Sequence, residues 1–248
     1  MRLRFPAALL VAALAAAGAA FVIRPTPVLQ ERALVVEIPP HVGVTTIARH
    51  LEAEGAVRSA WTAVAVASVR GVARRLKAGE YEFPRGASTL EVVRMVESGR
   101  VRQHPVLHPE GATVRELATV LGAARLARID DVIRLANDRA FLAAQNIEGP
   151  SAEGYLFPDT YQFVRGLTVE EMLGRMVQRT RAKLTPEILA RAKARGLRMH
   201  QLLTLASIIE REAAVPEEQR LIAAVFWNRL QLAMPLQADP TVQYALGK

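Results

Sequence analysis

Cysteine is absent from the 248 residues of this chain. Its absence excludes disulfide bonds, zinc–thiolate sites, iron–sulfur clusters, a cysteine nucleophile and a lipid-modified cysteine anchor. The spacings HExxH, GxSxG and GxGxxG and the phosphate-binding loop are missing too. The sequence therefore argues against a metalloprotease, a serine hydrolase and a dinucleotide-dependent enzyme. We expect neither a cofactor nor a metal ion.

Acidic residues are fewer than basic ones: the chain has 24 Asp and Glu and 32 Lys and Arg. The net charge of +8 and the pI near 10.5 favour an anionic partner. Nucleic acid, acidic lipid and a carboxylate-bearing cell-wall polymer all meet that description, and charge alone does not choose among them. Hydrophobic residues make up 51% of the chain and charged residues 23%, so the chain is neither disordered nor a polytopic membrane protein.

Residues 5–23 contain no charged side chain. Arg2 and Arg4 precede this run, and Arg24 follows it. A helix of this length, at about 1.5 Å per residue, matches the roughly 30 Å core of a bilayer. We predict a transmembrane helix over 5–23, a cytoplasmic tail over 1–4 and a juxtamembrane linker over 24–32, with the rest of the chain exported. The alternative is a cleaved signal peptide, with small residues at Ala15, Ala17 and Ala19. Both interpretations count against nucleic acid as the partner.

A short strand, a Pro/Gly turn and an amphipathic helix recur in the first half of the chain. Residues 36–51 match residues 106–121 at an offset of 70, and residues 84–96 match 109–121 at an offset of 25. The predicted helix caps of the three copies are Gly43, the capping box of Ser88 with Glu91, and the capping box of Thr113 with Glu116.

Between the first two copies we expect a helix from Trp61 to Lys77, capped by Ser59, and a return strand over residues 79–83. Strands and two helices together predict a compact α/β module over 33–101. A spacer domain without a ligand fits these patterns equally well.

Helical patterns dominate from Pro105 onward, and we expect a mainly helical (α+β) domain over 102–248. The predicted helices are residues 129–146, a helix capped by Thr168 and Glu171 that runs to Leu184, and a helix that Thr185-Pro186 opens and Gly196 closes. Residues 153–161 are rich in aromatic side chains. Because Pro158 bars a regular helix there, we expect a loop.

Residues 199–214 predict a helix that is apolar nearly all round, which is typical of a buried helix. Glu210 and Glu212 project between apolar neighbours on this helix. Burial raises the pKa of a carboxyl group, and a general acid needs a raised pKa near neutral pH. The alternative is that both glutamates lie at the helix end and pair with Arg211, Arg191 or similar partners. The helical wheel does not separate Glu210 from Glu212.

Downstream, Asp239 is expected to cap a helix that Pro240 opens, and Asn228 is either a hydrogen-bonding core residue or a substrate contact. His104 and His108 are four residues apart, but the intervening Pro105 argues against a shared helical face and a metal site.

Six segments stand out as motifs: Ala78-Gly-Glu-Tyr81, Pro109-Glu-Gly111, Ser151-Ala-Glu-Gly-Tyr-Leu-Phe-Pro-Asp-Thr-Tyr161, Leu205-Ala-Ser-Ile-Ile-Glu-Arg-Glu212, Val225-Phe-Trp-Asn-Arg-Leu230 and Leu236-Gln-Ala-Asp-Pro-Thr-Val242. In this order they resemble the YceG-like (MltG-type) family of endolytic murein transglycosylases. The resemblance spans essentially the whole chain and includes the amino-terminal anchor.

The resemblance implies a single-pass inner-membrane protein with a LysM-like module and a catalytic domain. Such enzymes cleave the β-1,4 bond between N-acetylmuramic acid and N-acetylglucosamine in nascent peptidoglycan and leave 1,6-anhydro ends. It implies Glu210 as the general acid and base, and peptidoglycan glycan strands and peptidoglycan synthases as partners. Residues expected to contact the substrate are Glu153, Tyr155, Asp159, Asn228, Gln237 and Asp239.

Family members continue beyond the position of Lys248, so the resemblance also implies a chain truncated at its carboxy end, with an incomplete cleft. An internal sugar hydroxyl removes the need for a second catalytic carboxylate. The alternative hypothesis is a non-catalytic, membrane-anchored protein that binds peptidoglycan or acts as a scaffold.

Overall fold

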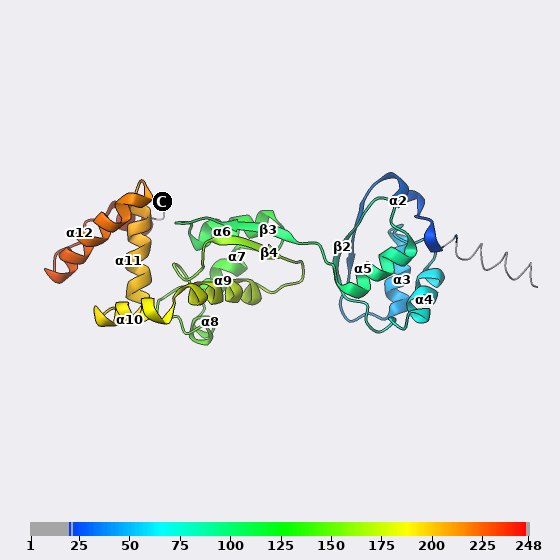
Figure 1. Ribbon diagram of the computed structural model, residues 1–248, viewed down its shortest axis with the longest axis horizontal. Coiled ribbons are helices and arrows are strands. Elements are labelled where there is room, and N and C mark those ends of the chain that lie inside the picture. The colour runs from blue at the N-terminus through cyan, green and yellow to red at the C-terminus, as the bar shows by residue number, and fades with distance from the viewer. Residues whose placement is uncertain (1–19, 21, 247–248) are drawn as a thin grey trace, which may run out of the picture. The chain divides into compact units, whose positions relative to one another are not determined.

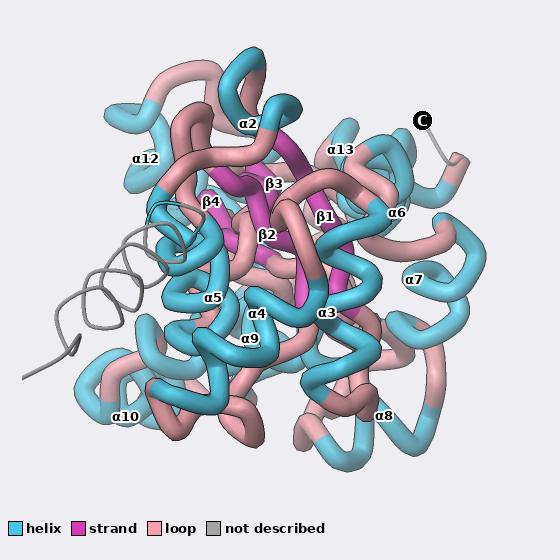
Figure 2. Tube along the Cα trace, turned by 90° about the vertical axis from the view of Figure 1, so that its right-hand side faces the viewer, coloured by secondary structure: helices cyan, strands magenta, loops and turns pink. Residues whose placement is uncertain are grey.

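The computed structural model describes residues 20 and 22–246. The chain divides into two compact units (Figure 1), which are Met1–Gln103 with Val164–Gly166, and His104–Phe163 with Leu167–Lys248. Helices make up most of the described chain, and the strands are few and short (Figure 2), so the class is α+β as expected. The predicted membrane span over 5–23 lies almost entirely outside the described residues. Among the residues that are described, no helix is long and apolar enough to cross a membrane.

The first unit packs helices around a two-stranded antiparallel sheet. Its elements are α2 (Pro27–Glu31), β1 (Leu34–Ile38), α3 (Val44–Ala53), α4 (Ala60–Val69), β2 (Gly79–Phe83) and α5 (Thr89–Ser98). Strand β1 pairs with β2 so that Leu34 lies opposite Phe83. Alternate strand residues, such as Val36 and Tyr81, enter a core that α3 and α5 complete with Leu51 and Val92.

In the first unit, one predicted strand is confirmed and one predicted helix is shorter than expected. The return strand over Gly79–Phe83 is confirmed. The helix expected to reach Lys77 ends at Val69, because Gly71 takes a left-handed conformation (φ 67°) and the amide of Val72 bonds back to the carbonyl of Ala67.

Residues 24–32, expected as a linker, are built into the first unit. The short helix α2 lies there, and its Leu29 side chain is fully buried. The Thr26 hydroxyl accepts a hydrogen bond from the Leu29 amide and donates one to the carbonyl of Gly55 (2.6 Å).

The second unit begins with the same order of elements and ends in a group of helices. The elements are β3 (His104–His108), α6 (Val114–Ala123), α7 (Ile129–Ala136), α8 (Arg139–Ala144), β4 (Asp159–Phe163), α9 (Val169–Lys183), α10 (Pro186–Ala194), α11 (Met199–Glu212), the 3-10 turn η1 (Pro216–Glu218), α12 (Gln219–Gln231) and α13 (Asp239–Ala245). Strand β3 pairs with β4, and His108 lies opposite Asp159. Helices α6, α7 and α9 bury this sheet in a second core.

Three expectations for the second unit are corrected by the structure. The helix expected over 129–146 is two helices, because Asp138 caps α8 by accepting a hydrogen bond from the Phe141 amide. The expected loop over 153–161 ends in strand β4, since Pro158 bars a helix but not an extended chain. Asp239 is the first residue of α13 rather than its cap, which is Ala238.

The strand–turn–helix repeat is confirmed, and the described residues contain four copies instead of three. Each five-residue strand is followed by a residue with positive φ and then by the helix cap two positions later. The residue pairs are His41 with Gly43, Gly86 with Ser88, Gly111 with Thr113, and Gly166 with Thr168. The capping boxes expected at Ser88, Thr113 and Thr168 are all formed.

Candidate active site

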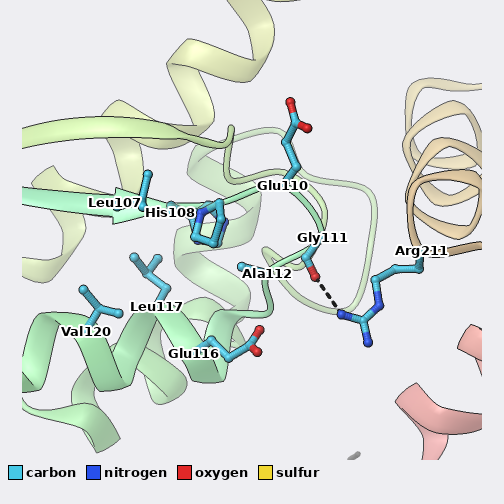
Figure 3. A pocket seen from close by; sticks show the side chains of 10 residues that line it. Leu107, His108, Glu110, Gly111, Ala112, Glu116, Leu117, Val120 and Arg211 are labelled. Atoms are coloured by element: carbon cyan, nitrogen blue, oxygen red, sulfur yellow. Dashed lines mark hydrogen bonds between the residues drawn. The ribbon is translucent and has the colours of Figure 1, made fainter. Parts of the chain in front are cut away.

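The turn between β3 and α6 forms one wall of a cavity of about 210 Å³ in the second unit (Figure 3). Arg211 of α11 closes the cavity from the other side. Its guanidinium Nη1 donates a hydrogen bond to the carbonyl of Gly111 (3.3 Å). The lining residues are Leu107, His108, Pro109, Glu110, Gly111, Ala112, Glu116, Leu117, Val120 and Arg211. The cavity therefore joins two segments that are a hundred residues apart in the sequence.

Local backbone chemistry fixes the shape of this turn. Gly111 has φ 70°, a conformation that favours glycine, and a Cβ added there would lie 3.2 Å from Cδ of Arg211. Two residues later the capping box begins α6. The Thr113 hydroxyl accepts from the Glu116 amide (3.2 Å), and the Thr113 amide donates to the Glu116 carboxylate (2.7 Å).

Both signs of charge line the cavity. Figure 3 shows Glu116 and Arg211 extending toward each other from opposite walls. Hydrogen bonds from the amide and the hydroxyl of Thr113 lower the pKa of Glu116, and the charge of Arg211 lowers it further. Glu116 is therefore ionised at neutral pH and faces a guanidinium across the cavity, so the walls offer both a hydrogen-bond acceptor and donors to a polar ligand.

Glu210 lies in the last turn of α11, next to Arg211, and is half-buried. One oxygen of its carboxylate, Oε2, accepts a hydrogen bond from the side-chain amide of Gln219 (3.1 Å). Gln219 is the first residue of α12, so the turn through η1 brings it back onto α11. Gln219 could not be predicted from the sequence, because its approach to Glu210 depends on that turn and on no periodic pattern.

The expected burial of helix α11 is wrong. The helix forms over Met199–Glu212, but none of its residues is buried, and Glu212 is exposed. Helices α10, α12 and α13 and the Gly111 turn contact α11 and cover only part of its circumference. An apolar pattern reports which side chains could be buried, whereas burial also requires a neighbour on every side.

Glu153 lies beside the start of α6. Its two carboxylate oxygens accept hydrogen bonds from the amide of Val114 at 3.3 and 3.1 Å. Burial raises the pKa of Glu153 and the charge of Glu116 raises it further, while the Val114 hydrogen bond opposes them. The charge of Glu153, after burial, also raises the pKa of Tyr244 in α13. The hydrogen bonds from Val114 place Glu153 at the end of the cavity turn.

Tyr155 and Asp159, both expected to contact substrate, have structural partners. The Tyr155 ring is 2% exposed, and its hydroxyl shares a hydrogen bond with Nδ1 of His200 (3.1 Å), so the ring is a core residue in this structure. The Asp159 carboxylate accepts a hydrogen bond from the amide of Thr160 and forms an ion pair with the guanidinium of Arg179 (2.9 Å). These two contacts lower the pKa of Asp159. The prediction that these two residues contact the substrate stays a prediction, and their partners in this structure are protein groups.

Asn228, Gln237 and Asp239 are all exposed and lie along α12 and the segment that leads to α13. Gln237 has φ 50°, and Arg229 donates a hydrogen bond to the carbonyl of Leu236, which holds this segment against α12. None of these three residues lines the cavity. In the described residues, no group of three or more His, Asp or Glu side chains could hold a metal ion.

Comparison with known proteins places the chain in a class. The model of the "YceG-like family" matches residues 36–248, and the chain belongs to that family. An endolytic murein transglycosylase of Streptococcus pneumoniae serotype 2 is 31% identical over 241 residues, covering 87% of this chain and 43% of that protein. The endolytic murein transglycosylase of Bacillus subtilis is 30% identical over 229 residues, covering 86% of this chain and 63% of that protein.

A YceG-like protein of Listeria monocytogenes, solved at 2.6 Å, shares the fold with a TM-score of 0.55 and 30% identity. The match covers 88% of this chain and 77% of that one. The chain thus spans less than two thirds of the length of the two curated relatives.

Proposed function

We propose that this chain is an endolytic lytic transglycosylase that cuts peptidoglycan glycan strands, with Glu210 as its general acid and base. The supporting observation is the position of Glu210, half-buried beside Arg211 and oriented by the amide of Gln219 at 3.1 Å. Membership of the YceG-like family and relatives named endolytic murein transglycosylase support the same assignment. The basic net charge suits a polymer that carries carboxylates.

The proposed reaction needs one proton shuttle and no cofactor. Protonated Glu210 donates a proton to the oxygen of the β-1,4 bond between N-acetylmuramic acid and N-acetylglucosamine as that bond breaks. The resulting carboxylate then takes the proton from the 6-hydroxyl of the muramic residue, which attacks its own anomeric carbon. The product carries a 1,6-anhydro end, and no water is consumed. Because the nucleophile belongs to the substrate, a second catalytic carboxylate is not required.

Gln219 and Arg211 have supporting roles in this proposal. The Gln219 amide holds Oε2 of Glu210 and leaves Oε1 for the glycosidic oxygen. Arg211 spans to the Gly111 carbonyl and fixes the end of α11 against the cavity turn. Its guanidinium is also available to an anionic peptide stem or lactyl carboxylate of the substrate.

The proposal also assigns roles to residues 5–23 and to the first unit. We propose that residues 5–23 anchor the chain in the plasma membrane, with the bulk of the chain outside the cytoplasm. The first unit is proposed as a LysM-like module, since β1, α3, α4 and β2 follow one another in a strand–helix–helix–strand order with antiparallel strands. Peptidoglycan synthases are proposed partners.

The proposal is tested by digesting purified glycan strands with the full chain and measuring anhydromuramic ends by mass spectrometry. We expect Glu210→Gln to lower the yield about 100- to 10,000-fold, which is the usual contribution of a general acid or base. Glu212→Gln is the matched control, because Glu212 is exposed two residues further along the same helix, and it should cleave normally. Undiminished cleavage by Glu210→Gln would contradict the assignment of Glu210.

A non-catalytic wall-binding protein is the second candidate, and the strand–helix–helix–strand order of the first unit favours it. It predicts that the chain sediments with purified sacculi but releases no anhydromuramic ends. The same digestion therefore separates the two candidates.

A further inference from the structure

Helix α4 in the first unit presents an apolar face to solvent. Trp61 is 84% exposed and Val69 is 89% exposed, and Ala65 between them is exposed as well. These three residues are four positions apart and share one side of the helix. Ala63 and Ala67 point the opposite way, into the core. Exposed apolar side chains that line up in this way form a patch, and apolar patches mark contact surfaces more often than single exposed residues do.

The chain that enters the first unit is fixed to the turn just before α4. The guanidinium of Arg58 donates a hydrogen bond to the carbonyl of Pro25 (2.7 Å), and the Thr26 hydroxyl donates one to the carbonyl of Gly55 (2.6 Å). Val28 packs so closely on Gly55 that an added Cβ would lie 2.9 Å from it. The segment that follows the proposed membrane anchor is therefore attached at residues 55–58.

This attachment limits how far α4 can be from the membrane. Ile23 ends the uncharged run, and its side chain is 62% exposed in the described structure. Pro25 is two positions after Ile23, and Trp61 is three positions after Arg58. At no more than about 3.6 Å per residue, plus the reach of the Arg58 side chain and one hydrogen bond, Trp61 lies within roughly 30 Å of the end of the anchor.

The charges beside this face suit an acidic surface. Arg70, Arg74 and Arg75 directly follow α4 and are exposed. Arg70 and Arg75 both pair with the same carboxylate, that of Glu97, at 3.0 and 2.9 Å. One glutamate against three arginines leaves this end of the helix positive. Tryptophan is enriched at membrane–water interfaces and arginines are attracted to anionic headgroups, so this combination suits the surface of a bilayer.

We propose that the face of α4 formed by Trp61, Ala65 and Val69 rests in the headgroup layer of an anionic bilayer, with Arg70, Arg74 and Arg75 on the lipid phosphates. The inference rests on the anchor proposed above, and it goes further by giving the first unit a fixed side toward the membrane. A sugar would also stack on Trp61, but the rest of the face offers Ala65 and Val69, which donate no hydrogen bond to a glycan.

Tryptophan fluorescence tests this contact, because Trp61 and Trp227 are the chain's two tryptophans. The full chain carrying Trp227→Phe is synthesised in the presence of vesicles of phosphatidylcholine and phosphatidylglycerol, with or without brominated acyl chains. We expect brominated lipid to quench most of the Trp61 emission. Vesicles of phosphatidylcholine alone should quench less, since they lack the anionic headgroups. Equal quenching in both would overturn the role given to the arginines.

Two aspartate variants in the same background separate the face from the fold. Val69→Asp places a charge on the face and should reduce quenching several-fold. Thr45→Asp adds the same charge at the exposed start of α3 and should leave quenching unchanged. Circular dichroism should be the same for both variants, because both positions are exposed.

The remaining outcomes distinguish this inference from the anchor on which it rests. If the chain stays in the vesicles after an alkaline wash but Trp61 is not quenched, the anchor stands and the α4 contact is refuted. If the wash removes the chain, the anchor and the contact both fail. A change in Trp61 emission with soluble glycan strands, and none with lipid, would replace the bilayer by a sugar at this face.

Discussion

His108 is the last residue of strand β3 and lies beside the cavity turn. It is buried, with 4% of the residue exposed to solvent. Burial lowers the pKa of His108, and a hydrogen bond with the Leu156 backbone and the charge of Glu116 only partly oppose it. The ring nitrogen Nδ1 has no hydrogen-bond partner within the described structure. The folded second unit therefore favours the neutral imidazole.

We predict that His108 makes the chain less stable in acid. The unfolded chain binds a proton near pH 6.5, the ordinary histidine value, whereas the folded chain binds it only at lower pH. Stability is therefore full above about pH 6.5 and falls as the pH decreases from there toward the folded pKa. Urea unfolding between pH 7.5 and pH 5 measures this slope, and His108→Gln should reduce it.

His104→Gln is the matched control, since His104 starts the same strand and is less buried. It should keep the slope of the unmodified chain. A slope that survives His108→Gln would show that another group causes the acid sensitivity.

The role of a residue could be predicted from the sequence only where a motif or a hydrogen bond between near neighbours in the chain indicates it. The resemblance singled out Glu210 over Glu212, and that choice remains a prediction. The burial argument for the same helix was wrong, because periodicity does not reveal which neighbours cover a face. Tyr155 was expected to contact the substrate, and its partners Thr180 and His200, which lie 25 and 45 residues away, could not be predicted.

At the scale of elements, each described strand of both units leads into a helix through the same turn. The turn contains one residue with positive φ, two positions before the helix cap, and three of the four copies use glycine there. Gly86 and Gly111 have similar φ values, 83° and 70°, but different surroundings. No atom within 4 Å would meet a Cβ at Gly86, whereas Cδ of Arg211 would meet one at Gly111.

We predict that Gly86→Ala and Gly111→Ala both lower the free energy of unfolding by about 1–2 kcal/mol, the cost of a left-handed residue with a side chain. Only Gly111→Ala should impair glycan cleavage, because its methyl group displaces Arg211 from the cavity wall. A displacement near 1 Å can lower the rate up to about 100-fold. Chemical denaturation and the anhydromuramic assay measure the two effects, and equal activity of both variants would contradict the role given to Arg211.

Helix starts were the most predictable elements, since a capping box is written in four consecutive residues. The boxes at Ser88, Thr113 and Thr168 all form. The fourth strand, Asp159–Phe163, was missed because Pro158 suggested only a loop and because strand pairing with β3 joins residues about fifty positions apart. Local chemistry is visible in one sequence, whereas pairing between distant segments is not.

At the scale of the whole molecule, the two units repeat one plan. Both place two antiparallel strands against a helix that follows each strand, and equivalent aromatic pairs stack in both. Tyr81 stacks on Phe83 at 6.0 Å and Tyr161 on Phe163 at 5.5 Å between ring centroids. Each tyrosine hydroxyl donates to the carbonyl four residues earlier, at 2.9 and 2.7 Å. The offsets of 70 and 25 in the sequence indicated this plan, but the resemblance of the two strands at an offset of 80 was not recognised.

Each unit has its own hydrophobic core, and the two cores share no residue. Leu51 of α3 is buried in the first and Leu173 of α9 in the second. We predict that Leu51→Ala and Leu173→Ala each lower the free energy of unfolding by about 2–5 kcal/mol, the usual effect of the cavity left by a core leucine. The loss should be confined to the unit that holds the substitution. Hydrogen exchange followed by mass spectrometry resolves this, because peptides of the substituted unit should lose protection while those of the other unit keep it. A loss of protection across both units would mean that they unfold as one cooperative body, and the separation of their cores would then have no energetic consequence.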